Sequence, residues 1–230
     1  MTITINAEKI NVSWVSLTAT ILSSSKFGQG YDRVKVLHEI GLQTPLQTDE
    51  TFYIPAKDKP IDTRTNFPDG NITNFAGQRF KDIQDELEKF AQAVKDGNSQ
   101  VMDEMYQLLR STTLLAPVVY SAGTQVLTFE YELALYPEEG TNTFNLALWA
   151  PMPTFNVIPG GQVVATIQAP GTLAPFVATL LEAEGYIPDS EGNPTTQTVS
   201  KTLDQNLGLR HIISWVWQND PLFKVRYQYQ

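Results

Sequence analysis

Hydrophobic and polar residues alternate along several stretches of the chain, which is the pattern of half-buried β-strands. The clearest alternation spans 127–135, with Leu127, Phe129, Tyr131, Leu133 and Leu135 at every second position. Residues 10–22 also alternate, but their apolar positions change from even to odd numbers near Trp14 and Val15. Since one extra residue turns the following side chains to the other face, this change predicts a β-bulge.

Further strands are predicted at 31–39, 52–54, 210–218 and 222–229. The turn at 137–142 is followed by a second alternating run at 144–148, so 127–148 is interpreted as a hairpin. From 151 to 175, closely spaced Pro and Gly enclose short apolar runs at 155–158 and 162–168, which favours crossings between the sheets of a sandwich. Residues 175–184 predict a short helix.

Between the strands predicted at 52–54 and at 127–135, the spacing of apolar residues changes from two to three and four. Apolar residues spaced by three and four predict one stripe of a helix: Phe80, Ile83, Leu87, Phe90 and Val94. The segment 96–99 supplies Gly97 to end this helix and Ser99 to begin another, which predicts a helical hairpin. A single kinked helix is the alternative. Before it, four prolines between 45 and 68 predict an irregular arm.

Together these patterns predict a mainly β fold with an α insertion: an antiparallel β-sandwich or jelly-roll-like core that carries a helical hairpin. We expect one β-rich domain over 1–230, with the proline-rich arm at 41–75 and the hairpin insertion at 76–115.

Net charge and the lengths of the apolar runs argue against two classes of interaction, with nucleic acid and across a membrane. The net charge of −9 opposes direct binding of nucleic acid, which depends on Lys and Arg displacing counterions from phosphates. No run of about twenty apolar residues is present, so we expect no membrane span. The first residues alternate at once and lack the apolar run of a signal peptide, so we expect no cleaved leader.

Candidate catalytic groups are few, since the chain has no Cys and only two His, His38 and His211. Each His lies among apolar strand residues, where a structural role is the commoner one. Glu130 and Glu132 share a strand face that we interpret as solvated. The acidic loop 189–193 lacks the EF-hand spacing and is interpreted as a turn. We therefore expect no enzyme activity, no cofactor and no metal site.

The aromatic residues allow two interpretations. Trp14, Trp149, Trp215 and Trp217 could form an exposed platform for sugars or for a partner, but their place in alternating strands favours core packing. The helical stripe likewise either covers the sheet or docks on another subunit.

In its general texture the chain resembles virion structural proteins of bacteriophages, through its opening strand pattern, its Pro- and Gly-rich connections and its aromatic terminal strands. The resemblance implies a capsid, cement, neck or tail component, found in the virion and assembled in the host cytoplasm. Its partners would be copies of itself and other virion structural proteins. The alternatives are a non-catalytic β module that binds a carbohydrate or a cell surface and, third, a carboxylate-dependent hydrolase.

If the chain is such an assembly protein, we expect its subunit contacts on the arm, on the helical stripe and on the edges of the terminal strands. The candidate contact residues are Phe52, Tyr53, Ile54, Leu87, Phe90, Trp215, Trp217, Tyr227 and Tyr229.

Overall fold

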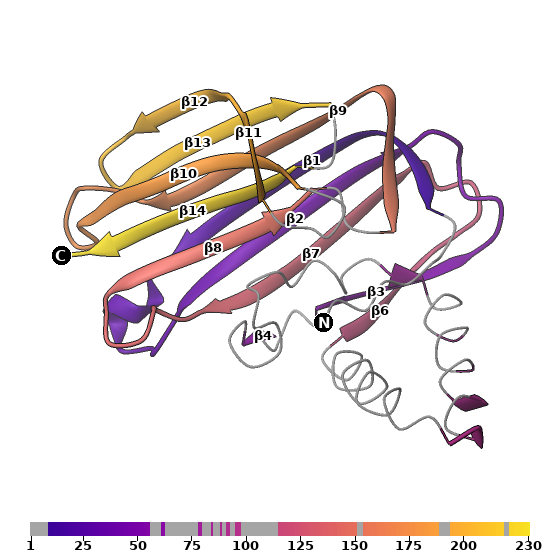
Figure 1. The fold of residues 1–230 in the computed structure, drawn as a ribbon, viewed down its shortest axis with the longest axis horizontal. Helices are drawn as coiled ribbons and strands as arrows, with labels where there is room; N and C mark the ends of the chain where they lie inside the picture. The colour runs from indigo at the N-terminus through magenta and orange to yellow at the C-terminus, as the bar shows by residue number, and fades with distance from the viewer. Residues whose placement is uncertain are drawn as a thin grey trace.

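The fold is mainly β, as the alternation predicts (Figure 1). The computed structural model describes residues 9–55, 61–62, 78–79, 84, 88, 91–92, 95–97, 115–150, 154–188, 194–218 and 221–230. Within these residues, no helix has the length and apolar character needed to cross a membrane.

Most of the strands belong to two sheets. The larger sheet has seven strands, in the order β12 (Lys201–Asn206), β13 (Arg210–Trp217), β9 (Phe155–Pro170), β1 (Ile10–Leu22), β2 (Asp32–Leu42), β7 (Val126–Leu135) and β4 (Ile61–Asp62). The smaller sheet has the order β11 (Pro194–Val199), β10 (Ala178–Pro188), β14 (Leu222–Tyr229) and β8 (Thr143–Trp149). A third, short sheet has the order β5 (Gln78–Arg79), β3 (Glu50–Pro55) and β6 (Leu115–Tyr120), and a 3-10 helix, η1 (Ser24–Phe27), follows β1.

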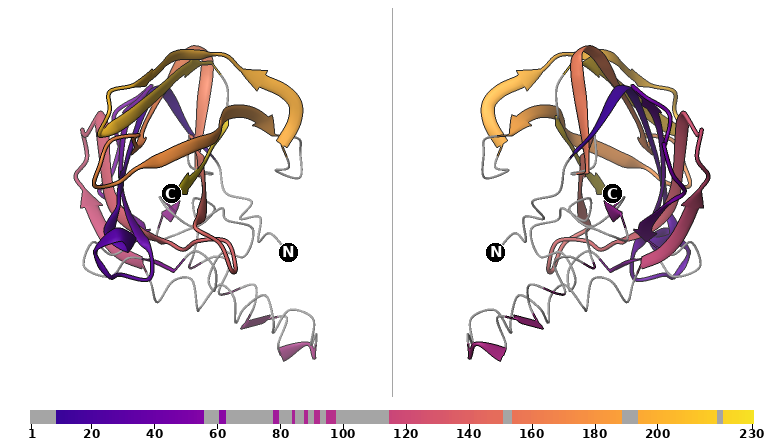
Figure 2. Two further views of the ribbon diagram at one scale, coloured as in Figure 1. Left: turned by 90° about the vertical axis from the view of Figure 1, so that its left-hand side faces the viewer. Right: turned by 90° about the vertical axis from the view of Figure 1, so that its right-hand side faces the viewer.

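The two larger sheets pack face to face in a sandwich-like arrangement, and the core lies between them. Trp215 of β13 contacts Phe223 of β14 with ring centroids 5.0 Å apart, and both side chains are fully buried. Viewed along its long axis, the larger sheet curves across its width (Figure 2). The alternating residues of 127–135 all point into this core, as predicted.

The predicted bulge in the first strand is confirmed. The pairings of β1 with β2 and with β9 both shift register between Val12 and Trp14. Val12 and Val15 are therefore both buried although they are three positions apart, a spacing that places residues on opposite faces of a regular strand. On the β9 side the shift brings in extra residues around Gly160, whose φ is +83°. A bulge in each strand keeps the apolar face inward past this point.

The core is not purely antiparallel, which corrects the prediction. β1 pairs with β9 in parallel, β4 pairs with β7 in parallel, and the remaining strand pairs are antiparallel. Alternation reports which face of a strand is buried, but it carries no information on the direction of the neighbouring strand. The sequence pattern could not reveal that the first strand lies between β2 and β9.

Two predicted elements are wrong in kind. β7 and β8 are both present, but they belong to different sheets, so 127–148 is a crossing between sheets and not a hairpin. The turn residues between β7 and β8 suit a hairpin within one sheet and a crossing between two sheets equally well. The segment 175–184 forms most of strand β10 instead of a helix, because its apolar residues pair with those of β14.

The predicted helical hairpin at 76–115 lies largely outside the described residues, and the described ones do not show it. Within it, Gln84, Glu88, Ala91, Gln92 and Lys95 have helical conformation. Gly97 has a φ of +78°, the left-handed conformation expected at a helix end.

The described part of the proline-rich arm packs against its own chain. β3 pairs with β6, and Leu46 donates a backbone hydrogen bond of 2.9 Å to Thr124. The fully buried Phe52 ring contacts Phe129 and Phe155 at centroid distances of 5.6 and 6.0 Å. The rest of the arm, apart from Ile61–Asp62, lies outside the described residues.

Candidate interaction surface

One end of the seven-stranded sheet presents a group of apolar side chains to solvent. The parallel strands β1 and β9 both finish at this end, on the left of Figure 1, and β13 begins there. Four side chains from three different loops are between 49% and 69% exposed: Phe27, Leu173, Leu207 and Leu209. Together with the partly buried Phe176 we call them the apolar end.

Close backbone packing holds two of these loops together. The Leu173 N–H donates to the Gly208 carbonyl at 3.0 Å, and the Gly171 N–H donates to the Leu209 carbonyl at 3.1 Å. Gly208 has a φ of +85°, and the Leu173 side chain lies over it. A Cβ at Gly171 would overlap the Gly208 carbonyl. Glycine at both positions is therefore what allows the loops to meet.

The third loop joins the apolar end through aromatic contacts. The Phe27 and Phe176 rings meet edge to face with centroids 6.0 Å apart. The Arg210 guanidinium lies 6.0 Å from the centre of the Phe176 ring and donates a hydrogen bond to the Ile21 carbonyl. These contacts tie η1 to the loop after β9, so the apolar end is an ordered surface built from three loops.

A pocket lies at the other end of β13. Its volume is about 400 Å³, and its described lining residues are Gln162, Val216, Trp217 and Gln218. Val216 is 41% exposed there. The Trp217 Nε1 is buried and has no hydrogen-bond partner in the described part of the chain.

The free edge beside this region is protected against strand pairing. All six residues of β12 are exposed, but its pairing with β13 is irregular between Lys201 and Leu203. The Asp204 carboxylate is held by Lys201 and by His211, whose Nε2 lies 2.6 Å away, and these hydrogen bonds lower its pKa. A bulge and a lysine on an edge strand both disfavour addition of another strand.

A buried carboxylate links the two sheets near the apolar end. Asp32 at the start of β2 is fully buried and accepts hydrogen bonds from the Tyr227 and Tyr229 hydroxyls of β14, at 2.6 and 2.7 Å. The Ser25 N–H and hydroxyl donate to its other oxygen, at 2.9 and 2.6 Å. Burial is the main cause that raises the pKa of Tyr227 well above its usual value, and the charge of Asp32 raises it further. Both tyrosines therefore remain donors to the carboxylate.

The two histidines do not meet, because β2 and β13 are separated by β1 and β9. His38 is fully buried, stacks on Tyr131, and has its Nε2 3.2 Å from the Tyr131 hydroxyl. Its Nδ1 has no partner among the described residues. Burial lowers the pKa of His38 to about 3, so the imidazole is neutral at pH 7. His38 is thus a core residue, as its surroundings in the sequence predict.

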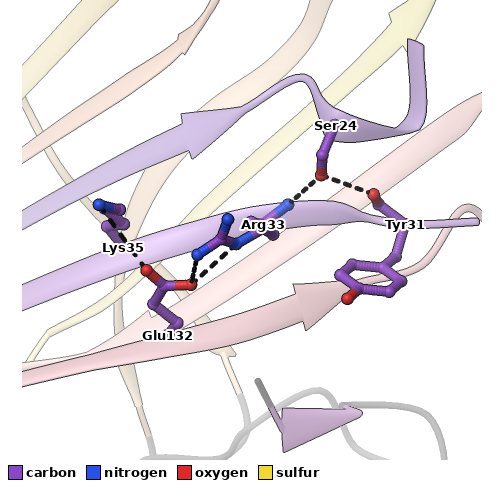
Figure 3. A network of polar contacts seen from close by, with 5 residues as sticks. All are labelled: Ser24, Tyr31, Arg33, Lys35 and Glu132. Atoms are coloured by element: carbon purple, nitrogen blue, oxygen red, sulfur yellow. Dashed lines mark hydrogen bonds and ion pairs between the residues drawn. The ribbon is translucent and has the colours of Figure 1, made fainter. Parts of the chain in front are cut away.

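The two glutamates on β7 differ in their surroundings. Glu130 is exposed, whereas Glu132 binds the Arg33 guanidinium, with Nε at 2.9 Å, and lies 3.8 Å from Lys35 (Figure 3). The Ser24 hydroxyl fixes the backbone beside Arg33, accepting from its N–H at 2.9 Å and donating to the Tyr31 carbonyl at 2.8 Å. This network joins β2 and β7 to the loop after β1, and Glu132 serves it as an ion-pair partner.

Most of the described candidate contact residues lie in the core. Five are buried within their own chain, namely Phe52, Ile54, Trp215, Tyr227 and Tyr229. These five side chains therefore offer a partner no surface, contrary to their assignment as subunit contacts, whereas the burial of Trp215 agrees with the core packing that its alternating strand favours. The physical reason is that alternation identifies a buried face without showing that the chain's own second sheet covers it. Tyr53 and Trp217 are partly exposed, and Leu87 and Phe90 lie outside the described residues.

The acidic loop 189–193 also lies outside the described residues. In the described part of the chain, no group of three or more His, Asp or Glu side chains could hold a metal ion. The apolar end was not predicted from the sequence. Its one signal was leucine placed beside glycine in loops, as in Leu207-Gly208-Leu209, and this carries no period to detect.

Comparisons with known proteins add no relative: no family model matches the chain, and no curated protein matches it.

Proposed function

We propose that this protein is a structural subunit of a larger assembly, and that the assembly is a bacteriophage virion. Its main partners are copies of itself, together with other virion structural proteins. The observation that carries the assembly proposal is the apolar end, where four large side chains from three loops face solvent. The general resemblance of the sequence to virion proteins supports the choice of assembly.

The energetic argument rests on the exposed leucines. Covering apolar surface contributes about 25 cal/mol for each Å² removed from water, so each half-exposed leucine contributes on the order of 1 kcal/mol when a partner covers it. The loops are already held by hydrogen bonds and by close glycine contacts. A partner therefore gains this burial at a small cost in loop ordering.

The jelly-roll-like description of the core and the helical hairpin at 76–115 belong to the same proposal. The hairpin is a second contact element, and the helical conformation of Gln84, Glu88, Ala91, Gln92 and Lys95 supports a helix there. Its apolar stripe would cover a neighbouring subunit.

Light scattering coupled to size-exclusion chromatography tests this proposal over a concentration series, followed by electron microscopy of any assembled fraction. We expect the mass to rise above the 25.7 kDa of one chain and the particles to be rings, shells or tubes. A mass of one chain at every concentration, with no particles, would overturn the proposal.

A further inference from the structure

We propose that the outer face of the larger sheet binds a neutral carbohydrate around Trp14. The Trp14 indole supplies a platform on which a sugar ring stacks, and the neighbouring positions of β1 and β9 supply hydroxyl and amide groups. This inference goes beyond the proposed function and does not depend on it, since it concerns a different surface from the apolar end.

The Trp14 indole lies face-on against the backbone of the neighbouring strand. A Cβ built at Gly41 of β2, the register partner of Trp14, would lie 2.1, 2.3 and 2.6 Å from the ring atoms Nε1, Cε2 and Cδ1. Because an edge-on ring would hold its second and third atoms farther away, these similar distances mean that the face of the ring covers Gly41. Glycine allows this close approach. The side chain is still 39% exposed, which leaves its opposite face for a ligand.

The two strands that carry this platform and its neighbours have no charged side chains in this region. Residues 14–20 of β1 and 162–168 of β9, which lie side by side in the larger sheet (Figure 1), include no charged residue, although the net charge of the chain is −9. The same face carries charges only farther across, as at Lys35 of β2 and Glu132 of β7. A ligand over β1 and β9 finds no counter-charge, which favours a neutral one.

Hydroxyl and amide groups lie beside the platform. Gln162 of β9 is exposed and pairs with Trp14, and Thr166 pairs with Thr18 farther along the same two strands. The Thr166 hydroxyl lies 2.9 Å from the Ser214 hydroxyl of β13, and one hydrogen bond between two hydroxyls leaves both with further capacity. These groups can donate and accept, as binding of sugar hydroxyls requires.

A neutral sugar satisfies both kinds of group at once. A sugar ring presents apolar C–H groups on its face and hydroxyls around its rim, so its face suits the indole and its rim suits the amide and hydroxyl groups. An apolar protein surface would cover Trp14 but bury the Gln162 amide without partners, which is unfavourable. An acidic sugar or a nucleic acid would meet no Lys or Arg along residues 14–20 and 162–168, and the net negative charge would repel it.

Affinity gel electrophoresis of the full chain tests this inference. Dextran, mannan and xylan are cast into native gels as neutral probes, and polygalacturonate serves as the acidic probe. We expect at least one neutral polysaccharide to retard the protein in proportion to its concentration in the gel, and polygalacturonate to have no such effect.

Variants locate the binding. Trp14→Ala should weaken the affinity by at least about tenfold, as truncation of a central Trp does in other interfaces. Gln162→Ala should weaken it less, and it carries the test should Trp14→Ala fold poorly in thermal unfolding. Leu181→Ala, at a position 46% exposed on β10 of the smaller sheet, is the matched control and should bind as the unmodified protein does.

Three results would overturn the inference: no retardation by any neutral probe, retardation by polygalacturonate alone, or equal retardation of Trp14→Ala, Gln162→Ala and the unmodified protein. Loss of self-association in Trp14→Ala, with no sugar binding by the unmodified protein, would assign this face to a second copy instead. The assembly proposal is tested separately by the mass of the unmodified protein, so either proposal can fail while the other stands.

Discussion

Asp32 and the apolar end lie close together in the fold, and both reverse the usual placement of polar and apolar groups. Asp32 is a fully buried carboxylate, whereas Phe27, five positions earlier, is an exposed aromatic side chain. The chain itself stabilises the buried carboxylate, because Asp32 accepts four hydrogen bonds from Ser25, Tyr227 and Tyr229. In the described part of the chain, Phe27 meets Phe176 edge to face and still stays 69% exposed.

The difference separates a group that stabilises the fold from a surface that, in our proposal, binds a partner. A buried charge without its donors would be strongly unfavourable, so the hydrogen bonds around Asp32 belong to folding. Exposed leucines are tolerated in a monomer, but a cluster of them on ordered loops marks an interaction surface. Changes at the buried centre should therefore alter the free energy of unfolding, and changes at the apolar end should alter association.

The largest expected effect is that of Asp32→Ala. This change removes the carboxylate that accepts from both the Tyr227 and the Tyr229 hydroxyl, and losing several charge-assisted hydrogen bonds costs about 4 kcal/mol. Urea unfolding measures the loss. Glu139→Ala, at an exposed turn position, is the matched control and should leave stability nearly unchanged. Equal losses in the two variants would show that the buried centre does not hold the sheets together.

Acid should destabilise the fold through His38. Its folded pKa of about 3 lies below its ordinary value of 6.5, so the unfolded chain takes up the proton first as the pH falls. The stabilisation is complete above pH 6.5 and is lost progressively towards pH 3. Between pH 6.5 and 4.5 the loss amounts to about 2 kcal/mol.

The measurement is urea unfolding at several pH values, comparing the unmodified protein with His38→Leu. The part of the pH dependence due to His38 should disappear in that variant. Tyr131→Phe removes the hydroxyl beside the imidazole but keeps its burial, so this variant should retain the dependence. The same pH dependence in His38→Leu as in the unmodified protein would contradict the assignment.

Gly171→Ala tests whether the loops of the apolar end need their close approach. The added Cβ would overlap the Gly208 carbonyl, and overpacking of this kind costs at least about 1 kcal/mol. Thermal unfolding would report the loss. Gly30→Ala is the control, because a Cβ there meets nothing within 4 Å, and its melting temperature should stay the same or rise slightly. A Gly171→Ala variant as stable as the control would show that the loops move apart freely.

The smallest expected effect on stability is that of Leu207→Asp. Its side chain is exposed, so the free energy of unfolding should change by no more than about 0.5 kcal/mol. Association should be lost, because the change introduces a charge into the apolar end. Val119→Asp on β6, at a position 66% exposed, is the control and should retain association. Loss of association in both variants would mean that charge alone, and not the apolar end, governs assembly.

Much of the fold followed from hydrophobic periodicity. The alternation at 127–135 predicted β7 and its buried residues, and the change from even to odd apolar positions predicted the bulge in β1. Periodicity could not show which strands are neighbours. The turns after β7 and after β13 connect different sheets, yet their sequences suit a hairpin just as well. Strand β12 was missed because it is exposed throughout and so has no apolar face.

The candidate surface was less predictable than the fold. The core positions of Trp215 and Tyr227 follow from alternation, but alternation alone could not show that the opposite sheet covers them. The apolar end depends on three loops that are distant in sequence, and Leu173 and Gly208 meet only because β9 and β13 are neighbours. Such a surface requires the strand order, which no local pattern contains.

Sedimentation equilibrium of the unmodified protein beside Leu207→Asp tests the central claim most directly. The account predicts that the mass of the unmodified protein rises with concentration while the variant stays at 25.7 kDa. An unmodified protein that stays at the mass of one chain, or a variant that associates as strongly as the unmodified protein, would contradict it.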